Sequence, residues 1–195
     1  MTGIISDNVG RAGGLVKAAG GGGSLVRLET KTVAASSYDF ETGLSSTYDQ
    51  FMLVWRLKPV TDSAFLEVQV ATGDPPSYQA GSSYEWLTAH WSNEVNNIKT
   101  HNEGDSKMRP HSDRGVGNAG SEGCTGKMFF NSPSSTDIYT MFHWTGYVIN
   151  DSTDGFVTPG GGHWEGATDA VTGIRLKFSS GNISGEASLY GVVRE

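Results

Sequence analysis

The stretch from Gln50 to Val70 constrains the fold of this chain more than any other. Residues 50–58 form a run of apolar, β-branched and aromatic side chains that ends at Pro59. This run is apolar almost throughout, which indicates a strand covered on both faces. In the second run, residues 63–70, apolar side chains recur at every second position, which is typical of a half-buried strand. Because a short Pro-Val-Thr-Asp connection joins the two runs, we predict a β-hairpin.

The composition favours an all-β fold around this hairpin. Glycine accounts for 27 of the 195 residues, and strong helix formers are scarce. Further extended segments are predicted at 24–33, 38–40, 83–91, 127–130, 137–150, 172–178 and 184–193. About eight to ten strands belong to a jelly roll or a related sandwich. We therefore predict a jelly-roll-like antiparallel β-sandwich head over residues 25–195, preceded by an extended N-terminal arm.

Residues 93–126 are predicted to be the longest irregular part of the head. Asn and Gly are frequent there, and five glycines follow residue 114. A structureless stretch of this length inside a compact domain is uncommon and often functional. Ordinary disorder is the alternative interpretation.

Residues 1–24 differ in composition from everything after them. The segment ends in Gly20–Ser24, which has the composition of a flexible linker. Its apolar residues are Ile4, Ile5, Val9, Leu15 and Val16. A purely solvated tail has little use for such residues, so we favour an arm that docks on another protein over a disordered tail.

Charge and cysteine usage exclude several classes of partner. The net charge of −7, without a cluster of Lys or Arg, argues against direct binding of nucleic acid. A single cysteine, Cys124, rules out an intrachain disulfide and cysteine-based metal sites; we interpret it as a small residue of a Gly-rich loop. No apolar stretch approaches the roughly 20 residues of a membrane span, and no signal-peptide core is present. We expect synthesis in a cytoplasm and no membrane insertion.

Metal and cofactor sites are not expected either. The five histidines are scattered without the i, i+2 or i, i+4 spacing of a metal site: His90, His101, His111, His143 and His163. Residues 150–155 resemble an oxygen-rich calcium loop but lack its glutamate, so an Asx-rich turn is the better interpretation. No cofactor fingerprint appears in the sequence.

Catalytic motifs are equally absent from the sequence. It contains no nucleophile elbow and no phosphate-binding loop. Paired carboxylates for sugar hydrolysis would have to come from Glu85, Glu94, Glu103 or Glu165. Scattered acidic residues on a β protein are usually only solvated, so we expect no enzymatic activity.

Tryptophans offer the strongest candidate for a ligand site. Trp86, Trp91, Trp144 and Trp164 lie near tyrosine and histidine residues in the sequence. Aromatic rings beside polar groups stack on sugars, but a sandwich of this size also needs a large aromatic core, which is the favoured interpretation. Trp91 and Trp164 have small and polar neighbours, so we expect them to be exposed. With His163 they form the candidate ligand-binding residues.

Both ends of the chain resemble one group of proteins. Residues 3–17, GIISDNVGRAGGLVK, resemble the start of small structural proteins of tailed bacteriophages, especially marine ones. Residues 172–183, TGIRLKFSSGNI, together with 188–192, SLYGV, resemble the end of the same proteins. The Tyr48-Asp49-Gln50 segment belongs to the resemblance too, whereas residues 71–170 match nothing that we can name.

The resemblance implies a component of the virion, made in the host cytoplasm. We predict a capsid decoration or cement protein whose partners are the major capsid protein or other virion proteins. Its attachment residues would be Ile4, Ile5, Val9, Arg11, Leu15 and Val16. The alternative is a tail-fibre or receptor-binding module that recognises host surface glycans, and a free carbohydrate-active enzyme is a distant third.

A homotrimer is the predicted oligomer. The final segment, 184–193, is apolar and carries a single charge, so as an edge strand it would need a neighbour. Identical chains usually close such contacts with cyclic symmetry. Phage spikes and fibres are commonly trimeric, so the resemblance to phage structural proteins favours a trimer.

Overall fold

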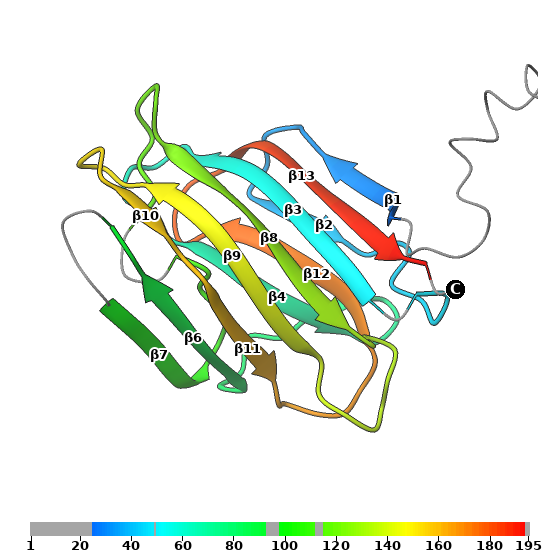
Figure 1. Cartoon of the computed structure of the whole chain (residues 1–195). Helices are drawn as coiled ribbons and strands as arrows, with labels where there is room; N and C mark the ends of the chain where they lie inside the picture. Colours follow the sequence, from blue (N-terminus) through cyan, green and yellow to red (C-terminus); the bar gives the residue numbers. More distant parts are fainter. Residues whose placement is uncertain (1–24, 49, 93–97, 112–114, 194–195) are drawn as a thin grey trace, which may run out of the picture.

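The computed structural model describes residues 25–48, 50–92, 98–111 and 115–193 of the chain. Thirteen strands and no helix occur in these ranges (Figure 1). The strands are β1 (Leu25–Lys31), β2 (Ser37–Phe40), β3 (Gln50–Pro59), β4 (Leu66–Thr72), β5 (Ser77–Tyr78), β6 (Tyr84–His90), β7 (Ile98–Asp105), β8 (Gly123–Asn131), β9 (Met141–Ile149), β10 (Gly155–Val157), β11 (Gly160–Trp164), β12 (Val171–Phe178) and β13 (Ile183–Val192).

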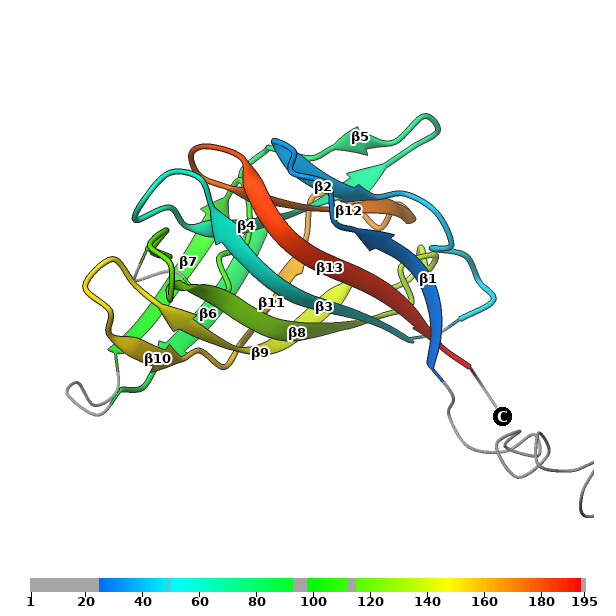
Figure 2. The ribbon, with the colours of Figure 1, turned by 90° about the horizontal axis from the view of Figure 1, so that it is seen from above.

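Two antiparallel sheets make up the molecule, which confirms the prediction of an all-β sandwich. The large sheet has nine strands in the order β1-β13-β3-β8-β9-β11-β6-β7, with β10 paired to β9. The small sheet has four strands in the order β2-β12-β4-β5 and lies over the large one (Figure 2). The strands β1-β13-β3-β8 make up one half of the large sheet. The strands β6, β7, β9, β10 and β11, here called the extension, lengthen the large sheet beyond it.

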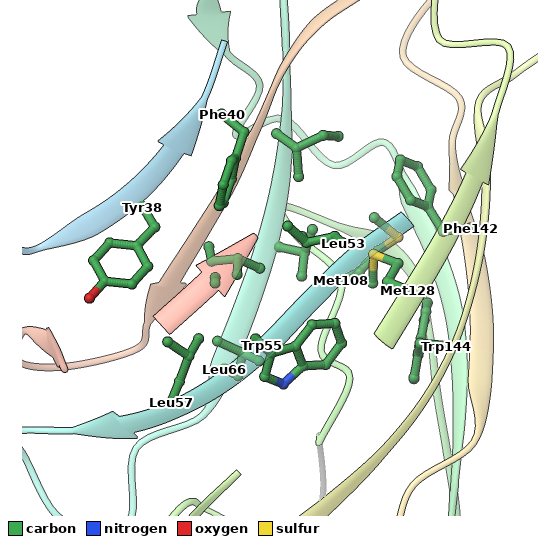
Figure 3. Close-up of a cluster of buried hydrophobic side chains, with 14 of the residues drawn as sticks. Tyr38, Phe40, Leu53, Trp55, Leu57, Leu66, Met108, Met128, Phe142 and Trp144 are labelled. Carbon is green, nitrogen blue, oxygen red and sulfur yellow. The ribbon is translucent and has the colours of Figure 1, made fainter. Parts of the chain in front are cut away.

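The predicted hairpin of residues 50–70 is wrong. Strand β3 pairs with β13 and β8 in the large sheet, whereas β4 pairs with β12 and β5 in the small sheet. The chain between them crosses from one sheet to the other. In this arrangement the apolar faces of both strands meet in one core, with Trp55 and Leu66 in the same buried cluster (Figure 3). A hairpin would have placed both faces on one sheet without covering them.

The burial of these two strands is also the reverse of the prediction. Strand β3 is buried on one face only, where Phe51, Leu53 and Trp55 lie, and Arg56 on its other face is exposed. Strand β4 is buried on both faces, because Glu67 and Gln69 are also covered. The alternation of polar residues in β4 therefore marks a second, polar contact layer and not a solvent face.

Glycines on the inner face of the large sheet make room for the tryptophan rings of the core. A Cβ on Gly126 would lie 2.5 Å from Trp55 Cζ2, and one on Gly160 would lie 2.5 Å from Trp144 Nε1. Packing in protein interiors leaves no space for such an atom. These strand glycines thus leave the space that the large aromatic rings occupy.

The inner face of the extension is covered by the chain after β7. Met108 and Val116 are fully buried and form antiparallel bridges with Val68 and Ala64. The prediction of an irregular stretch over residues 93–126 is therefore wrong for β7 and for the start of β8, whereas residues 106–111 and 115–122 belong to none of the thirteen strands and supply two core residues. Pairing with residues distant in sequence orders this glycine-rich stretch.

Polar groups are buried beneath this cover. His111 is fully buried, and its Nδ1 lies 2.8 Å from Thr158 Oγ1. Burial and the nearby His90 lower the pKa of His111 to about 3, so the imidazole is neutral at pH 7. The core beneath the extension therefore contains polar as well as apolar side chains.

The final strand is not an edge strand. Strand β13 lies between β1 and β3 and pairs with both along most of its length. The edges of the large sheet are β1 and β7, and β1 carries the charges of Arg27, Glu29 and Lys31. Charged side chains discourage pairing at an edge, so the edge-strand argument for a trimer does not hold.

Candidate functional site

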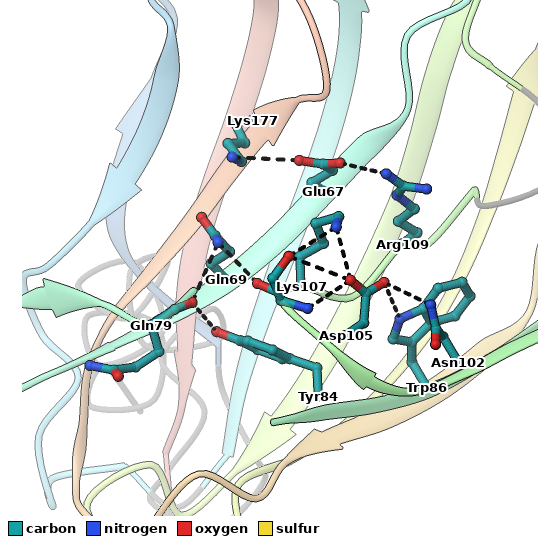
Figure 4. A network of polar contacts seen from close by, with 11 residues as sticks. Glu67, Gln69, Gln79, Tyr84, Trp86, Asn102, Asp105, Lys107, Arg109 and Lys177 are labelled. Atoms are coloured by element: carbon teal, nitrogen blue, oxygen red, sulfur yellow. Dashed lines mark hydrogen bonds and ion pairs between the residues drawn. The ribbon is translucent and has the colours of Figure 1, made fainter. Parts of the chain in front are cut away.

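The outer face of the small sheet is closed by ion pairs and hydrogen bonds (Figure 4). Glu67 is almost fully buried, and its carboxylate accepts a 3.0 Å hydrogen bond from Arg109 and lies 3.5 Å from Lys177 Nζ. Next to it, Gln69 Nε2 donates to the carbonyl oxygens of Ser106 and Gln79 at 3.0 and 3.4 Å. Buried polar groups are tolerated when paired in this way.

A second row of the same face is held by Arg175. Its guanidinium donates two hydrogen bonds, of 2.8 and 2.6 Å, to the carboxylate of Asp39 and lies 3.6 Å from the centre of the Tyr78 ring. Burial alone would raise the pKa of Asp39, but the hydrogen bonds from Arg175 and Ser37 and the charge of Arg175 outweigh it and lower that pKa. The charged side chains of this face are thus paired with one another.

The outer face of the extension is different in kind. Five large apolar or aromatic side chains are exposed there, here called the apolar patch: Leu87, Trp91, Met141, Tyr147 and Val157. Their exposed fractions run from 40% to 50%. Val157 is the cross-strand neighbour of both Tyr147 and Trp91, whereas Leu87 pairs with Gly161 and Met141 pairs with His163. Exposed apolar residues that adjoin one another, as Tyr147, Val157 and Trp91 do, typically mark a site of interaction.

A hollow of about 540 Å³ lies at one end of this patch. It is lined by Trp91, Ser92, Tyr147, Thr153, Asp154, Gly155 and Val157. The phenol of Tyr147 lies directly over Gly155, where a Cβ would collide with the hydroxyl. Two aromatic rings, a carboxylate and hydroxyls thus surround one opening, as in many sites for polar ligands.

A larger, open hollow of about 1000 Å³ runs along the outer side of β13, β3 and β8. Its side chains include Arg56, Lys58, Glu122 and Glu186, so its rim is charged and of mixed sign. Among the described residues that line it, no three His, Cys, Asp or Glu side chains lie close enough together to hold a metal ion.

The other end of the extension brings together Glu85, His163 and Glu165. Glu85 of β6 is the cross-strand partner of His163 of β11, and Glu165 follows two residues later on the same face. His163 Nε2 lies 3.8 Å from Glu85 Oε2 and 4.0 Å from Glu165 Oε2. The ring of Tyr139 stacks on the imidazole with centroids 5.7 Å apart.

The sequence-predicted ligand residues do not form one site. Trp164 is only 4% exposed, so the prediction that it is exposed is wrong, and its ring belongs to the core. Strand alternation turns Trp164 inward and His163 outward. Trp91 is 49% exposed as expected, but six residues of extended chain, about 20 Å, separate it from Glu85, the partner of His163. Trp86 and Trp144 are buried, in line with the core interpretation.

Other predicted features have clear outcomes. Asn150 Oδ1 accepts hydrogen bonds from the amides of Ser152 and Asp154, which confirms the Asx turn. Cys124 is buried in strand β8 and not in a loop, and burial raises the pKa of its thiol. The predicted attachment residues Ile4, Ile5, Val9, Arg11, Leu15 and Val16 lie outside the described residues.

Sequence reasoning missed the cluster around His163 because it compared histidines only with each other. The pair His163 and Glu165, at i and i+2, was a visible signal, since such residues share one face of a strand. Glu85 could not have been added, because its place opposite His163 depends on the pairing of β6 with β11.

Comparisons with known proteins do not assign the chain to a family. No family model matches the chain, and neither a curated protein nor a solved structure is significantly similar to it. Within the described ranges, no helix is long and apolar enough to cross a membrane.

Proposed function

We propose that this chain is a structural protein of a bacteriophage virion that decorates the capsid and binds it through the apolar patch. The observation that carries the proposal is the exposed apolar surface of Trp91, Tyr147 and Val157, with Leu87 and Met141 exposed on the same sheet face. The resemblance of residues 3–17 and 172–183 to phage structural proteins supports the choice of partner, the major capsid protein or a neighbour of it.

Two anchors at opposite ends of the large sheet would hold the protein on the particle. The segment before Leu25 joins β1 at one edge of the sheet, and the apolar patch lies at the other end, on the extension (Figure 1). Attachment through residues 1–24 and through the patch would fix both the position and the orientation of the head. The proposal involves no catalysis and no cofactor.

The test uses purified particles of the phage whose genome encodes the chain. Mass spectrometry should detect the protein in them. The Leu87→Ser/Met141→Ser variant should fold normally but bind poorly to particles that lack the protein. Val33→Ser is the matched control, because Val33 is 80% exposed and lies on the connection between β1 and β2. Absence from virions, or equal binding of the patch variant, would contradict the proposal.

The hollow at Trp91 supports a second candidate, recognition of a host surface glycan. The exposed ring of Trp91 could stack on a sugar, while Asp154 and Thr153 offer polar contacts beside it. In this case Trp91→Ala should abolish binding to host polysaccharide, whereas Leu87→Ser/Met141→Ser, outside the hollow, should leave that binding unchanged.

A homotrimer remains part of the proposal on the resemblance alone. The described edges of the large sheet are charged, so a trimer would have to form through another surface. The apolar patch is the surface that a second copy could cover, in competition with the capsid.

A further inference from the structure

We propose that Glu85, His163 and Glu165 form a binding site for a divalent transition-metal ion, best suited to Zn²⁺. The proposal is independent of the virion assignment, because it rests only on the geometry of three side chains. It concerns the end of the extension away from the hollow at Trp91.

The spacing of the three groups is that of ligands around an ion. One ligand atom from each residue lies within 4.8 Å of the other two. The distances from His163 Nε2 to the two carboxylates, 3.8 and 4.0 Å, exceed the range of a hydrogen bond. Bonds of about 2.0–2.1 Å in a tetrahedral zinc site place ligand atoms roughly 3.4 Å apart, so small rotations of the glutamates would suffice.

Electrostatics favour a cation at this point. Two carboxylates converge on one imidazole, and in the described part of the chain neither forms an ion pair with a Lys or Arg. A divalent ion would neutralise both charges. An imidazole nitrogen with carboxylate oxygens suits zinc and related metals, whereas Ca²⁺ and Mg²⁺ prefer oxygen ligands alone.

The backbone and a stacked ring hold the ligands in place. Glu85 and His163 are fixed by the register of β6 and β11, and the amide of Glu165 donates a 2.8 Å hydrogen bond to the carbonyl of Ser83. Tyr139 stacks on the imidazole from the connection before β9. Three protein ligands at a half-exposed position leave room for water or for a side chain of a bound partner as a further ligand.

The first measurement is calorimetric titration of ZnCl₂ into the untagged full chain at neutral pH. One Zn²⁺ should bind per chain, and Ca²⁺ and Mg²⁺ should not compete. His163→Ala, Glu85→Gln and Glu165→Gln should each weaken binding by more than the roughly 10–100-fold typical of losing an outer partner of a metal ligand. His143→Ala is the matched control, since His143 is exposed on the same face of neighbouring β9 but lies outside the cluster.

A second measurement locates the metal directly. Anomalous scattering at the zinc edge from crystals of the zinc-loaded protein should give a peak between the three side chains. Unchanged melting temperatures of the apo variants would show that they fold. Unweakened binding by His163→Ala, a zinc peak elsewhere only, or no saturable binding by the full chain would overturn the proposal and leave an ion-paired histidine.

Discussion

The outer face of the small sheet and the outer face of the extension carry different kinds of side chains. On the small sheet, the charges of Glu67, Asp39 and Arg175 are paired with opposite charges. On the extension, five large apolar side chains are half-exposed, and three of them, Tyr147, Val157 and Trp91, are cross-strand neighbours. The first face has no need of a partner, whereas burial of the second would be favourable by roughly 25 cal/mol per Å² of apolar surface.

This difference shows how composition can mislead about exposure. The face that looks hydrophilic in sequence contains nearly buried groups such as Glu67, and the face with the more apolar residues is the more accessible one. The charged face should therefore matter for stability and the apolar one for binding.

The largest expected effect is that of Glu67→Ala. Removal of one partner from a buried pair typically costs about 3–5 kcal/mol, and we expect about 2–3 kcal/mol because Arg109 and Lys177 are partly exposed. Glu186→Ala is the matched control, since Glu186 is exposed on the outer face of the large sheet. Denaturant unfolding measures both free energies. Equal losses would show that the ion pairs of Glu67 contribute no more to stability than an exposed charge does.

A smaller effect is expected on the stability of the fold at acidic pH. The pKa of Asp39 is lower in the folded chain than its ordinary value of 3.8, so its ion pair with Arg175 stabilises the fold above that pH. This contribution disappears as the pH falls below 3.8 through the folded pKa. Asp39→Asn should lose about 1 kcal/mol at pH 7 and show a flatter loss of stability between pH 4 and 2. Asp137→Asn, at an exposed position, should keep the wild-type pH profile.

The smallest expected effect is that of Leu87→Ser on stability. Leu87 is exposed on the outer face of β6, so the free energy of unfolding should change by less than about 0.5 kcal/mol. Calorimetric melting measures this. A loss of several kcal/mol would show that Leu87 packs within the domain and that the apolar patch is part of its core.

Much of the secondary structure could be predicted from the chain alone. The sequence pattern correctly predicted extended segments at 83–91, 172–178 and 184–193, where the structure has β6, β12 and β13. Trp55 is buried as its apolar neighbours indicated. These features depend on the two-residue period of a strand, which is a local property of the backbone.

The partners of each strand depended on the tertiary structure. The local pattern at residues 50–70 is equally compatible with a hairpin and with a crossing between sheets, and only burial of both apolar faces in one core selects the crossing. The same limit applies to the candidate sites. That His163 and Glu165 share a face follows from their spacing, but that Glu85 completes the cluster, and that Trp164 is buried while Trp91 is not, follows from which strands pair and what lies over them.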